Sequence, residues 1–320
     1  MPKLKEVYLN EYNIPIGGAV YLPLASGQLQ AYAQTKPEIL ANYCFMPFIF
    51  MRDDPERILA QYQDPAVAAF SASMWNMNLS LEVAQRVKER FPDCLVVFGG
   101  PQVPMDDMGR QRLFAVHPFI DVTVRGEGEH TFADVLIKFL AAQDLPHASL
   151  LMKPSLHPFQ SVRNISYRVG PTIITNEDHP LEGNPDIFPS PYLEGLFDYL
   201  LPTGMDFQVT VETSRGCPYR CTFCNWGQGR RYRLFSMERV RRVAEWCGRN
   251  RIKYVFCADS NFGMVKRDYE IAQYFVEAKA EYGYPEKFRA TFGKNAEERI
   301  FQIGKLLTEH DMEKGITLST

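Results

Sequence analysis

Short apolar runs of strand length alternate with amphipathic helical patterns along the first 140 residues. Strands are predicted at residues 5–10, 43–51, 66–74, 94–98 and 121–124, and helices at 27–34, 54–63, 79–91 and 129–140. In the helix at 79–91, apolar residues recur every four positions from Leu79 to Phe91. Because strands and helices alternate, the pattern predicts an α/β fold with a doubly wound parallel sheet over residues 1–141.

A second alternating pattern begins near residue 205. Strands are predicted at 207–211, 254–258 and 288–292, helices at 236–249, 268–282 and 295–307, and a further strand begins at 315. We therefore expect a second α/β domain over residues 205–320. Residues 142–204 are rich in proline and predict a connector, with a small hairpin at 163–168 and 172–175.

Between the strand at 207–211 and the helix at 236–249 lie three cysteines at C-x3-C-x2-C spacing, Cys217, Cys221 and Cys224. Thiolates gathered on a turning loop bind soft metal centres, including the irons of a cluster. Structural zinc is the first alternative, but it usually takes four ligands from paired C-x2-4-C knuckles, and no second C-x2-C occurs. Unrelated thiols are the second alternative. The spacing favours a 4Fe–4S cluster with one open iron.

Composition and charge give no support for a nucleic-acid-binding, membrane or secreted protein. The chain has 320 residues, 46% of them hydrophobic, and a net charge of −3, so no bulk charge favours nucleic acid as a partner. No apolar run reaches the length of a membrane span, and no signal-peptide pattern opens the chain. The other four cysteines lie in apolar contexts, which predicts buried thiols and a cytoplasmic location, at Cys44, Cys94, Cys247 and Cys257.

Glycines and polar residues follow the predicted strands, where α/β sheets bind ligands. In the first domain, glycines would let a ligand approach the backbone, and the candidates are Ser73, Trp75, Gly99, Gly100, Gln102, Gly126 and Glu127. In the second domain, polar residues at strand ends are candidate cofactor contacts, namely Asp259 and Asn261, with Ser319, Lys294 and Thr317 as weaker ones.

The cysteine loop resembles the signature of the radical SAM superfamily, in which an aromatic residue, here Phe223, precedes the third cysteine. The stretches GGPQ and RGEGEHTF are similar to the cobalamin-binding domain that is fused to many of those enzymes. This resemblance implies a Rossmann-like cobalamin domain followed by a partial (β/α)6 barrel, of which about half would lie in this chain. It also implies three cofactors: cobalamin, a 4Fe–4S cluster, and S-adenosylmethionine, with Phe223 among its contacts.

One departure concerns the lower face of the cobalamin. Domains that ligate cobalt with a histidine carry a D-x-H-x-x-G motif, and this sequence has none. Any bound cobalamin should therefore lack a histidine lower ligand. Trp75 ends its strand at a position from which it could cover that face. A core aromatic residue is the alternative reading of Trp75.

The resemblance implies a methyltransferase, which passes a methyl group from methylcobalamin to a substrate radical made by the 5′-deoxyadenosyl radical. The alternatives are a rearrangement or cyclisation by the same cofactors and a non-enzymatic cobalamin or redox sensor. An RNA methylthiotransferase is disfavoured, because that family carries a second cysteine triad. The expected partners are a small-molecule or peptide substrate, such as a natural-product intermediate, and an external low-potential electron donor, without nucleic acid or membrane.

Overall fold

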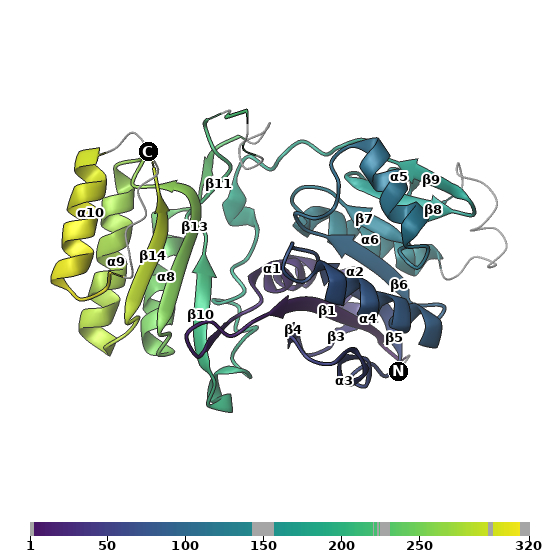
Figure 1. Ribbon diagram of the computed structural model, residues 1–320, viewed down its shortest axis with the longest axis horizontal. Helices are drawn as coiled ribbons and strands as arrows, with labels where there is room; N and C mark the ends of the chain where they lie inside the picture. The colour runs from purple at the N-terminus through teal and green to yellow at the C-terminus, as the bar shows by residue number, and fades with distance from the viewer. Residues whose placement is uncertain are drawn as a thin grey trace. The chain divides into compact units, whose positions relative to one another are not determined.

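The computed structural model describes residues 3–142, 157–219, 221–222, 224, 231–293 and 297–313. The chain divides into two compact units (Figure 1). Unit 1 comprises Met1–Ile14 and Ala25–Pro180, and unit 2 comprises Pro15–Leu24 and Leu181–Thr320. The chain thus enters unit 2 briefly, through residues 15–24, before it returns to complete unit 1.

Unit 1 is built on one twisted sheet with helices on both faces (Figure 1). Its strands are β1 (Lys5–Asn13), β3 (Tyr43–Phe45), β4 (Ile49–Met51), β5 (Pro65–Ser71), β6 (Leu95–Gly99), β7 (Val122–Val124), β8 (Ile165–Val169) and β9 (Thr172–Thr175). Its helices are α1 (Leu24–Ala33), α2 (Pro37–Asn42), α3 (Pro55–Leu59), α4 (Met77–Arg90), α5 (Asp107–Val116), α6 (Glu129–Ala142) and the 3-10 turn η2 (Pro158–Ser161).

The sheet of unit 1 is parallel except at one edge. Its order is β3-β1-β5-β6-β7-β8-β9, with β4 also pairing with β1, and only β8 and β9 are antiparallel to their neighbours. Most residues of β5 and β6 are small or apolar, as expected of strands that are buried on both faces. The predicted α/β class with a parallel sheet is confirmed, and so is the hairpin, which extends this sheet.

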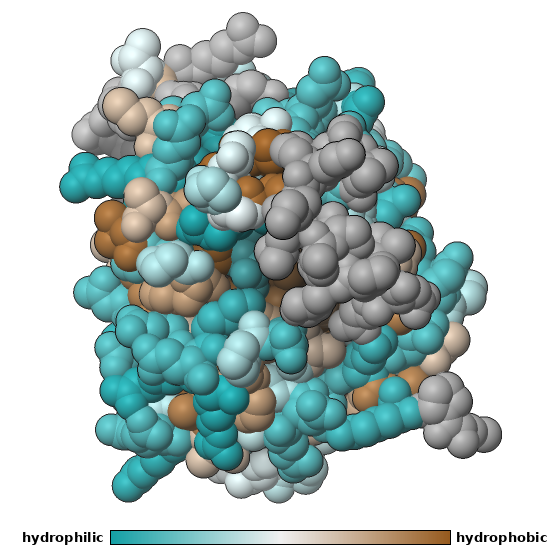
Figure 2. Space-filling model, turned by 90° about the vertical axis from the view of Figure 1, so that its right-hand side faces the viewer, coloured by the Kyte–Doolittle hydropathy of each residue, from teal (hydrophilic) through white to brown (hydrophobic). Residues whose placement is uncertain are grey.

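Residues on alternate sides of the strands fill two cores. On one face, Tyr8, Ala68 and Val96 pack with apolar residues of α3, α4 and α5. On the other face, α2 and α6 contact each other, and the Tyr43 hydroxyl donates to the Leu136 carbonyl at 2.7 Å. The face seen in Figure 2 is mostly hydrophilic, with hydrophobic residues in separate patches.

Unit 2 contains a parallel sheet of order β14-β13-β10-β2 in the residues described. The strands are β2 (Ala19–Tyr21), β10 (Asp206–Val211), β13 (Tyr254–Phe262) and β14 (Lys287–Phe292), with a separate ladder of β11 (Ser214–Arg215) and β12 (Arg233–Leu234). The helices are α8 (Met237–Arg249), α9 (Arg267–Tyr282) and α10 (Glu297–Glu309), with 3-10 turns η3 (Pro185–Ile187) and η4 (Leu201–Thr203). No helix among the described residues is long and apolar enough to cross a membrane.

Several local predictions need correction. Residues 43–51 form two short strands rather than one, because Pro47 interrupts the ladder. The strand predicted to reach residue 74 ends at Ser71. Of the four cysteines expected to be buried, Cys94, Cys247 and Cys257 are, whereas Cys44 is exposed on β3, which pairs only with β1 among the described strands.

Candidate functional site

The cysteine segment follows an inner strand of unit 2 and is closed at its base. β10 ends at Val211, and β11 then pairs antiparallel with β12, so that Arg215 lies opposite Arg233. The cysteines at positions 217, 221 and 224 lie between these two strands in the sequence. The cysteine loop lies at the carboxyl end of β10, the edge at which βα barrels carry their sites.

Asp259, a predicted contact of S-adenosylmethionine, is buried and holds the start of this loop. Its carboxylate accepts hydrogen bonds from the N–H and hydroxyl of Thr213, at 2.8 and 2.5 Å. It also accepts from the N–H and hydroxyl of Ser214, at 3.1 and 2.8 Å. Burial raises the pKa of Asp259, and these hydrogen bonds oppose the rise. The carboxylate thus fixes the backbone just before the cysteines, while its contact with S-adenosylmethionine stays a prediction.

The next two residues of β13 reach further along the loop. The Ser260 hydroxyl donates to the Gly216 carbonyl at 2.9 Å. The Asn261 side-chain nitrogen Nδ2 lies 3.1 Å from Cys217 Sγ and 3.0 Å from Ser260 Oγ. A register shift in the pairing of β13 with β14 falls across these residues, and such irregularities re-aim side chains near sites. Three consecutive residues of β13 therefore contact residues 213–217.

The three thiols are each partly exposed, and the Cys224 N–H donates to the Cys221 carbonyl at 3.1 Å. Among the described residues, no three His, Cys, Asp or Glu side chains are grouped closely enough to hold one metal ion. A cubane cluster makes a different demand, because each thiolate binds a different iron. The donor set fits such a cluster: soft sulfur ligands lie on one loop, and an amide N–H points at the first of them. The predicted contacts Phe223 and Ser319 lie outside the described residues, as do Lys294 and Thr317.

Arginines brace the backbone around the loop. Arg215 is buried, pairs with Glu212 at 3.0 Å, and lies over two phenylalanine rings. Arg233 is also buried and donates to the carbonyl of residue 182 at 2.9 Å. Arg267, at the start of α9, donates to the carbonyls of residues 213 and 235 at 2.7 and 2.6 Å. No sequence pattern singles out Arg267, since only the fold brings α9 to this loop.

In unit 1, the predicted cobalamin contacts follow β5, β6 and β7 at the carboxyl edge of the sheet. The strand order is flavodoxin-like, and the direction of winding reverses between β1 and β5. Doubly wound sheets bind ligands at such a switch point. Ser73 and Trp75 directly follow β5 there, so the topology places them at the expected edge.

The GGPQ segment is locked to the end of β5. Ala72 donates its N–H to the Gly99 carbonyl at 2.7 Å, and Gln102 donates to the Ala72 carbonyl at 3.1 Å. Gly100 has a φ of +99°, and a Cβ there would lie 2.7 Å from the Ala72 oxygen. Gly126 has a φ of +71°, but no atom lies within 4 Å of its Cβ position. Both positions favour glycine, and at Gly126 the backbone is open to a ligand.

Trp75 is 55% exposed and its neighbour Met74 is 81% exposed. The alternative of a core aromatic therefore does not describe Trp75. The turn that presents it is fixed by Asn76, which accepts from the Ser73 N–H at 2.8 Å and donates to the Ser71 carbonyl at 2.9 Å. Beyond β6, Met105 and Met108 are exposed as well, at 61% and 80%. Exposed apolar side chains after neighbouring strands fit a large, partly apolar ligand such as a corrin.

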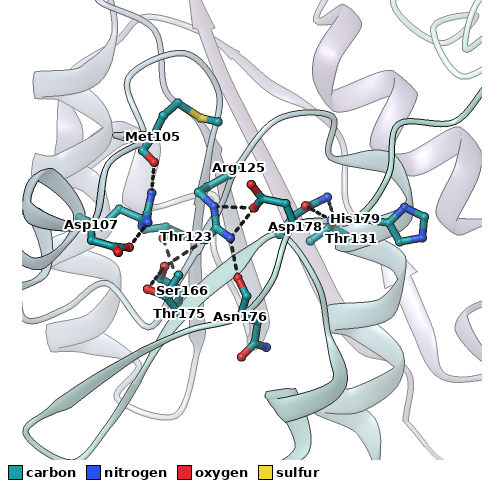
Figure 3. Close-up of polar contacts among 12 residues, drawn as sticks. Met105, Asp107, Thr123, Arg125, Thr131, Ser166, Thr175, Asn176, Asp178 and His179 are labelled. Atoms are coloured by element: carbon teal, nitrogen blue, oxygen red, sulfur yellow. Dashed lines mark hydrogen bonds and ion pairs between the residues drawn. The ribbon is translucent and has the colours of Figure 1, made fainter. Parts of the chain in front are cut away.

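Arg125, which follows β7, is buried and anchors the segment after the hairpin rather than lying in a solvated loop (Figure 3). Its guanidinium donates to the Asp178 carboxylate at 2.6 Å, to the Asn176 carbonyl at 2.7 Å and to the Ser166 hydroxyl at 3.2 Å. The glycine-rich turn that follows Arg125 is thus held from one side, and Glu127 within it is half-buried. The predicted roles of Gly126 and Glu127 in binding cobalamin stay predictions.

Known proteins resemble this chain both within unit 1 and over nearly its whole length. A family model described as "B12 binding domain" matches residues 42–136. A 2-(S-pantetheinyl)-carbapenam-3-carboxylate methyltransferase of Streptantibioticus cattleyicolor is 38% identical over 96% of the chain and 44% of its own length. The cobalamin-dependent radical SAM methyltransferase TokK of Streptomyces tokunonensis is 36% identical over 99% of the chain and 44% of its own length. An anaerobic magnesium-protoporphyrin IX monomethyl ester cyclase of Synechocystis is 26% identical over 53% of the chain and 30% of its own length.

The predicted resemblance is therefore confirmed: the chain is similar over nearly its whole length to two methyltransferases, one of them named as a cobalamin-dependent radical SAM enzyme, and residues 42–136 match the B12 binding domain. The chain spans less than half the length of the two methyltransferases it matches.

Proposed function

We propose that the protein is a cobalamin-dependent radical SAM methyltransferase that methylates a carbon of a small-molecule substrate. The observation that carries the proposal is the identity of 36–38% to two methyltransferases across nearly all of this chain. The B12-binding match in unit 1 and the cysteine loop in unit 2 agree with it, because that chemistry needs both kinds of cofactor.

Cys217, Cys221 and Cys224 would hold a 4Fe–4S cluster, and the carboxyl edge of the sheet of unit 1 would hold cobalamin. When bound, the cluster with S-adenosylmethionine supplies a 5′-deoxyadenosyl radical, and cobalamin supplies the methyl group. Asp259, Ser260 and Asn261 hold the beginning of the cysteine loop. Gly100 and Gln102 fix the turn after β6, and the open backbone at Gly126 would leave room for the bound cobalamin.

We further propose a cytoplasmic location and an external low-potential electron donor. The substrate proposed is a natural-product intermediate. The carbapenam-3-carboxylate thioether in the name of the Streptantibioticus relative is the first compound to assay. A cyclisation is the second candidate, because a magnesium-protoporphyrin ester cyclase matches about half the chain.

The test replaces Cys217, Cys221 and Cys224 together by alanine. After anaerobic reconstitution, the triple variant should lose the cluster's iron and its electron paramagnetic resonance, and with them the release of 5′-deoxyadenosine from S-adenosylmethionine. Cys44→Ala, which removes an exposed thiol of unit 1, is the matched control and should keep both.

Retention of a cubane signal by the triple variant would refute the cluster assignment. Incubation with methyl-labelled S-adenosylmethionine and the carbapenam substrate then separates the candidate functions. Label in the product supports methylation, 5′-deoxyadenosine with an unlabelled product that contains a new ring supports cyclisation, and no 5′-deoxyadenosine at all supports a sensor.

A further inference from the structure

We infer that Asn261 is a positioning residue for the first cysteine, and that its side-chain amide donates a hydrogen bond to the Cys217 thiolate and raises the reduction potential of the cluster held there. This inference rests on the proposed function, since it takes Cys217 as a ligand of that cluster. Its basis is the contact between Asn261 Nδ2 and Cys217 Sγ at 3.1 Å.

The neighbouring contacts fix the orientation of the amide. The Ser260 hydroxyl has one proton, which it donates to the Gly216 carbonyl, so its oxygen can only accept from Asn261 Nδ2 at 3.0 Å. A thiolate also accepts and cannot donate. The NH₂ group, which carries two donors, satisfies both acceptors, whereas the opposite amide orientation would direct Oδ1 at two groups with no proton to offer it.

The position of Asn261 is itself held by the strand. Asp259, two residues earlier on β13, is anchored by four hydrogen bonds to Thr213 and Ser214. Three consecutive residues of β13 thus contact residues 213–217, and Asn261 is the one among them that contacts the first cysteine. Such a brace keeps the amide and the sulfur at a fixed separation.

The effect on the cluster follows from charge. Reduction adds an electron that is shared with the sulfur ligands, so an N–H donor to one sulfur stabilises the reduced form more than the oxidised form. Hydrogen bonds to the sulfurs are among the factors that set the potentials of iron–sulfur clusters. The amide of Asn261 should therefore ease reduction of the cluster by a weak donor.

The test is a redox titration followed by electron paramagnetic resonance, with Asn261→Leu and Asn261→Asp, neither of which can donate to the sulfur. At a fixed potential, the ratio of reduced to oxidised cluster should fall about tenfold, a lowering of about 59 mV for a one-electron couple. Asn250→Asp, an equal change at the end of α8 where the amide binds the Trp246 carbonyl, should leave the potential unchanged. An unchanged potential in both Asn261 variants, with full iron content, would overturn the inference.

If the variants lose the cluster, a second measurement on the unmodified protein still tests the inference. In D₂O, electron nuclear double resonance of the reduced cluster should show coupling to an exchangeable deuteron. In protein labelled with ¹⁵N at asparagine, it should also show coupling to the side-chain nitrogen to which that deuteron is bonded. A normal cluster without that coupling would overturn the inference alone. Failure of the unmodified protein to assemble any cluster would instead refute the proposed function beneath it.

Discussion

At the scale of single residues, Asp259 and Asn261 of β13 bind the residues that begin the cysteine loop. Asp259 and Asn261 were singled out because polar residues at strand ends often contact cofactors. The structure shows the Asp259 carboxylate occupied by Thr213 and Ser214, and the Asn261 amide at the first cysteine. These roles depend on which loop lies beside β13. No sequence pattern around Thr213 or Ser214 predicts a contact with Asp259.

The exposure of Trp75 distinguishes two interpretations that the sequence alone left open, a core aromatic residue and a residue that covers the lower face of the corrin. A core tryptophan replaced by alanine costs about 3–5 kcal/mol, whereas surface substitutions usually stay within about 0.5 kcal/mol. Because the side chain is 55% exposed, Trp75→Ala should change the free energy of unfolding little. If the indole covers the lower corrin face, the same variant should shift the cob(II)alamin spectrum and slow methyl transfer, while 5′-deoxyadenosine release persists.

Urea denaturation and electron paramagnetic resonance of that variant decide between the readings. Phe91→Ala, a partly buried aromatic residue that packs against the core of unit 1, is a control that should lose stability without a specific change in the cobalamin spectrum. A stable Trp75→Ala protein with a native spectrum and a native methylation rate would leave Trp75 with no part in the site.

At the scale of elements, long segments with a clear period were predicted well, whereas α5, which has no clear apolar stripe, and some short elements were missed. The buried face of α8 carries apolar residues at helical spacing, including Val240, Val243 and Cys247, and Ser236 caps this helix by accepting from the Arg239 N–H. In α4 the buried face centres on Val83 and Val87 as predicted, but it includes Ser80 rather than Leu79. The short elements α2 and β2 offered too few residues for a period to be seen, and they were not predicted.

Two glycines at the carboxyl edge of unit 1 should respond differently to alanine. At Gly100 the new Cβ would meet the Ala72 oxygen at 2.7 Å in addition to the strain of a positive φ, so Gly100→Ala should destabilise by about 2–3 kcal/mol or more. At Gly126 only the conformational strain applies, so Gly126→Ala should cost about 1 kcal/mol.

Cobalamin binding should show a contrasting pattern. Gly126→Ala places a methyl group where we propose that the corrin approaches, so its affinity for cobalamin should fall more than its modest loss of stability implies. Urea midpoints and titrations with cob(II)alamin measure the two quantities separately. Native affinity in Gly126→Ala would show that the corrin does not approach this turn.

At the scale of the whole molecule, the order of elements along the chain predicted the α/β class but not the path of the chain. Residues 15–24 leave unit 1 and add β2 beside β10, nearly two hundred residues later in the sequence. Pairing between such distant segments depends on the assembled sheet, and no local pattern indicates it. The antiparallel hairpin was predicted as part of a connector, and only the structure shows that β8 pairs with β7.

The proposed cobalamin should bind without a histidine beneath the cobalt. The sequence has no D-x-H-x-x-G motif. Among the described histidines of unit 1, His130 contacts Tyr32 and His179, His157 caps η2, and His117 lies against the Phe119 ring. The cob(II)alamin form of the protein should therefore give a resonance without nitrogen splitting from an axial imidazole. Growth with ¹⁵N-histidine gives the control, because splitting from a histidine would change with the isotope. A splitting that does change would establish a histidine ligand, exclude Trp75 from the lower face, and require a different path of the chain beneath the corrin.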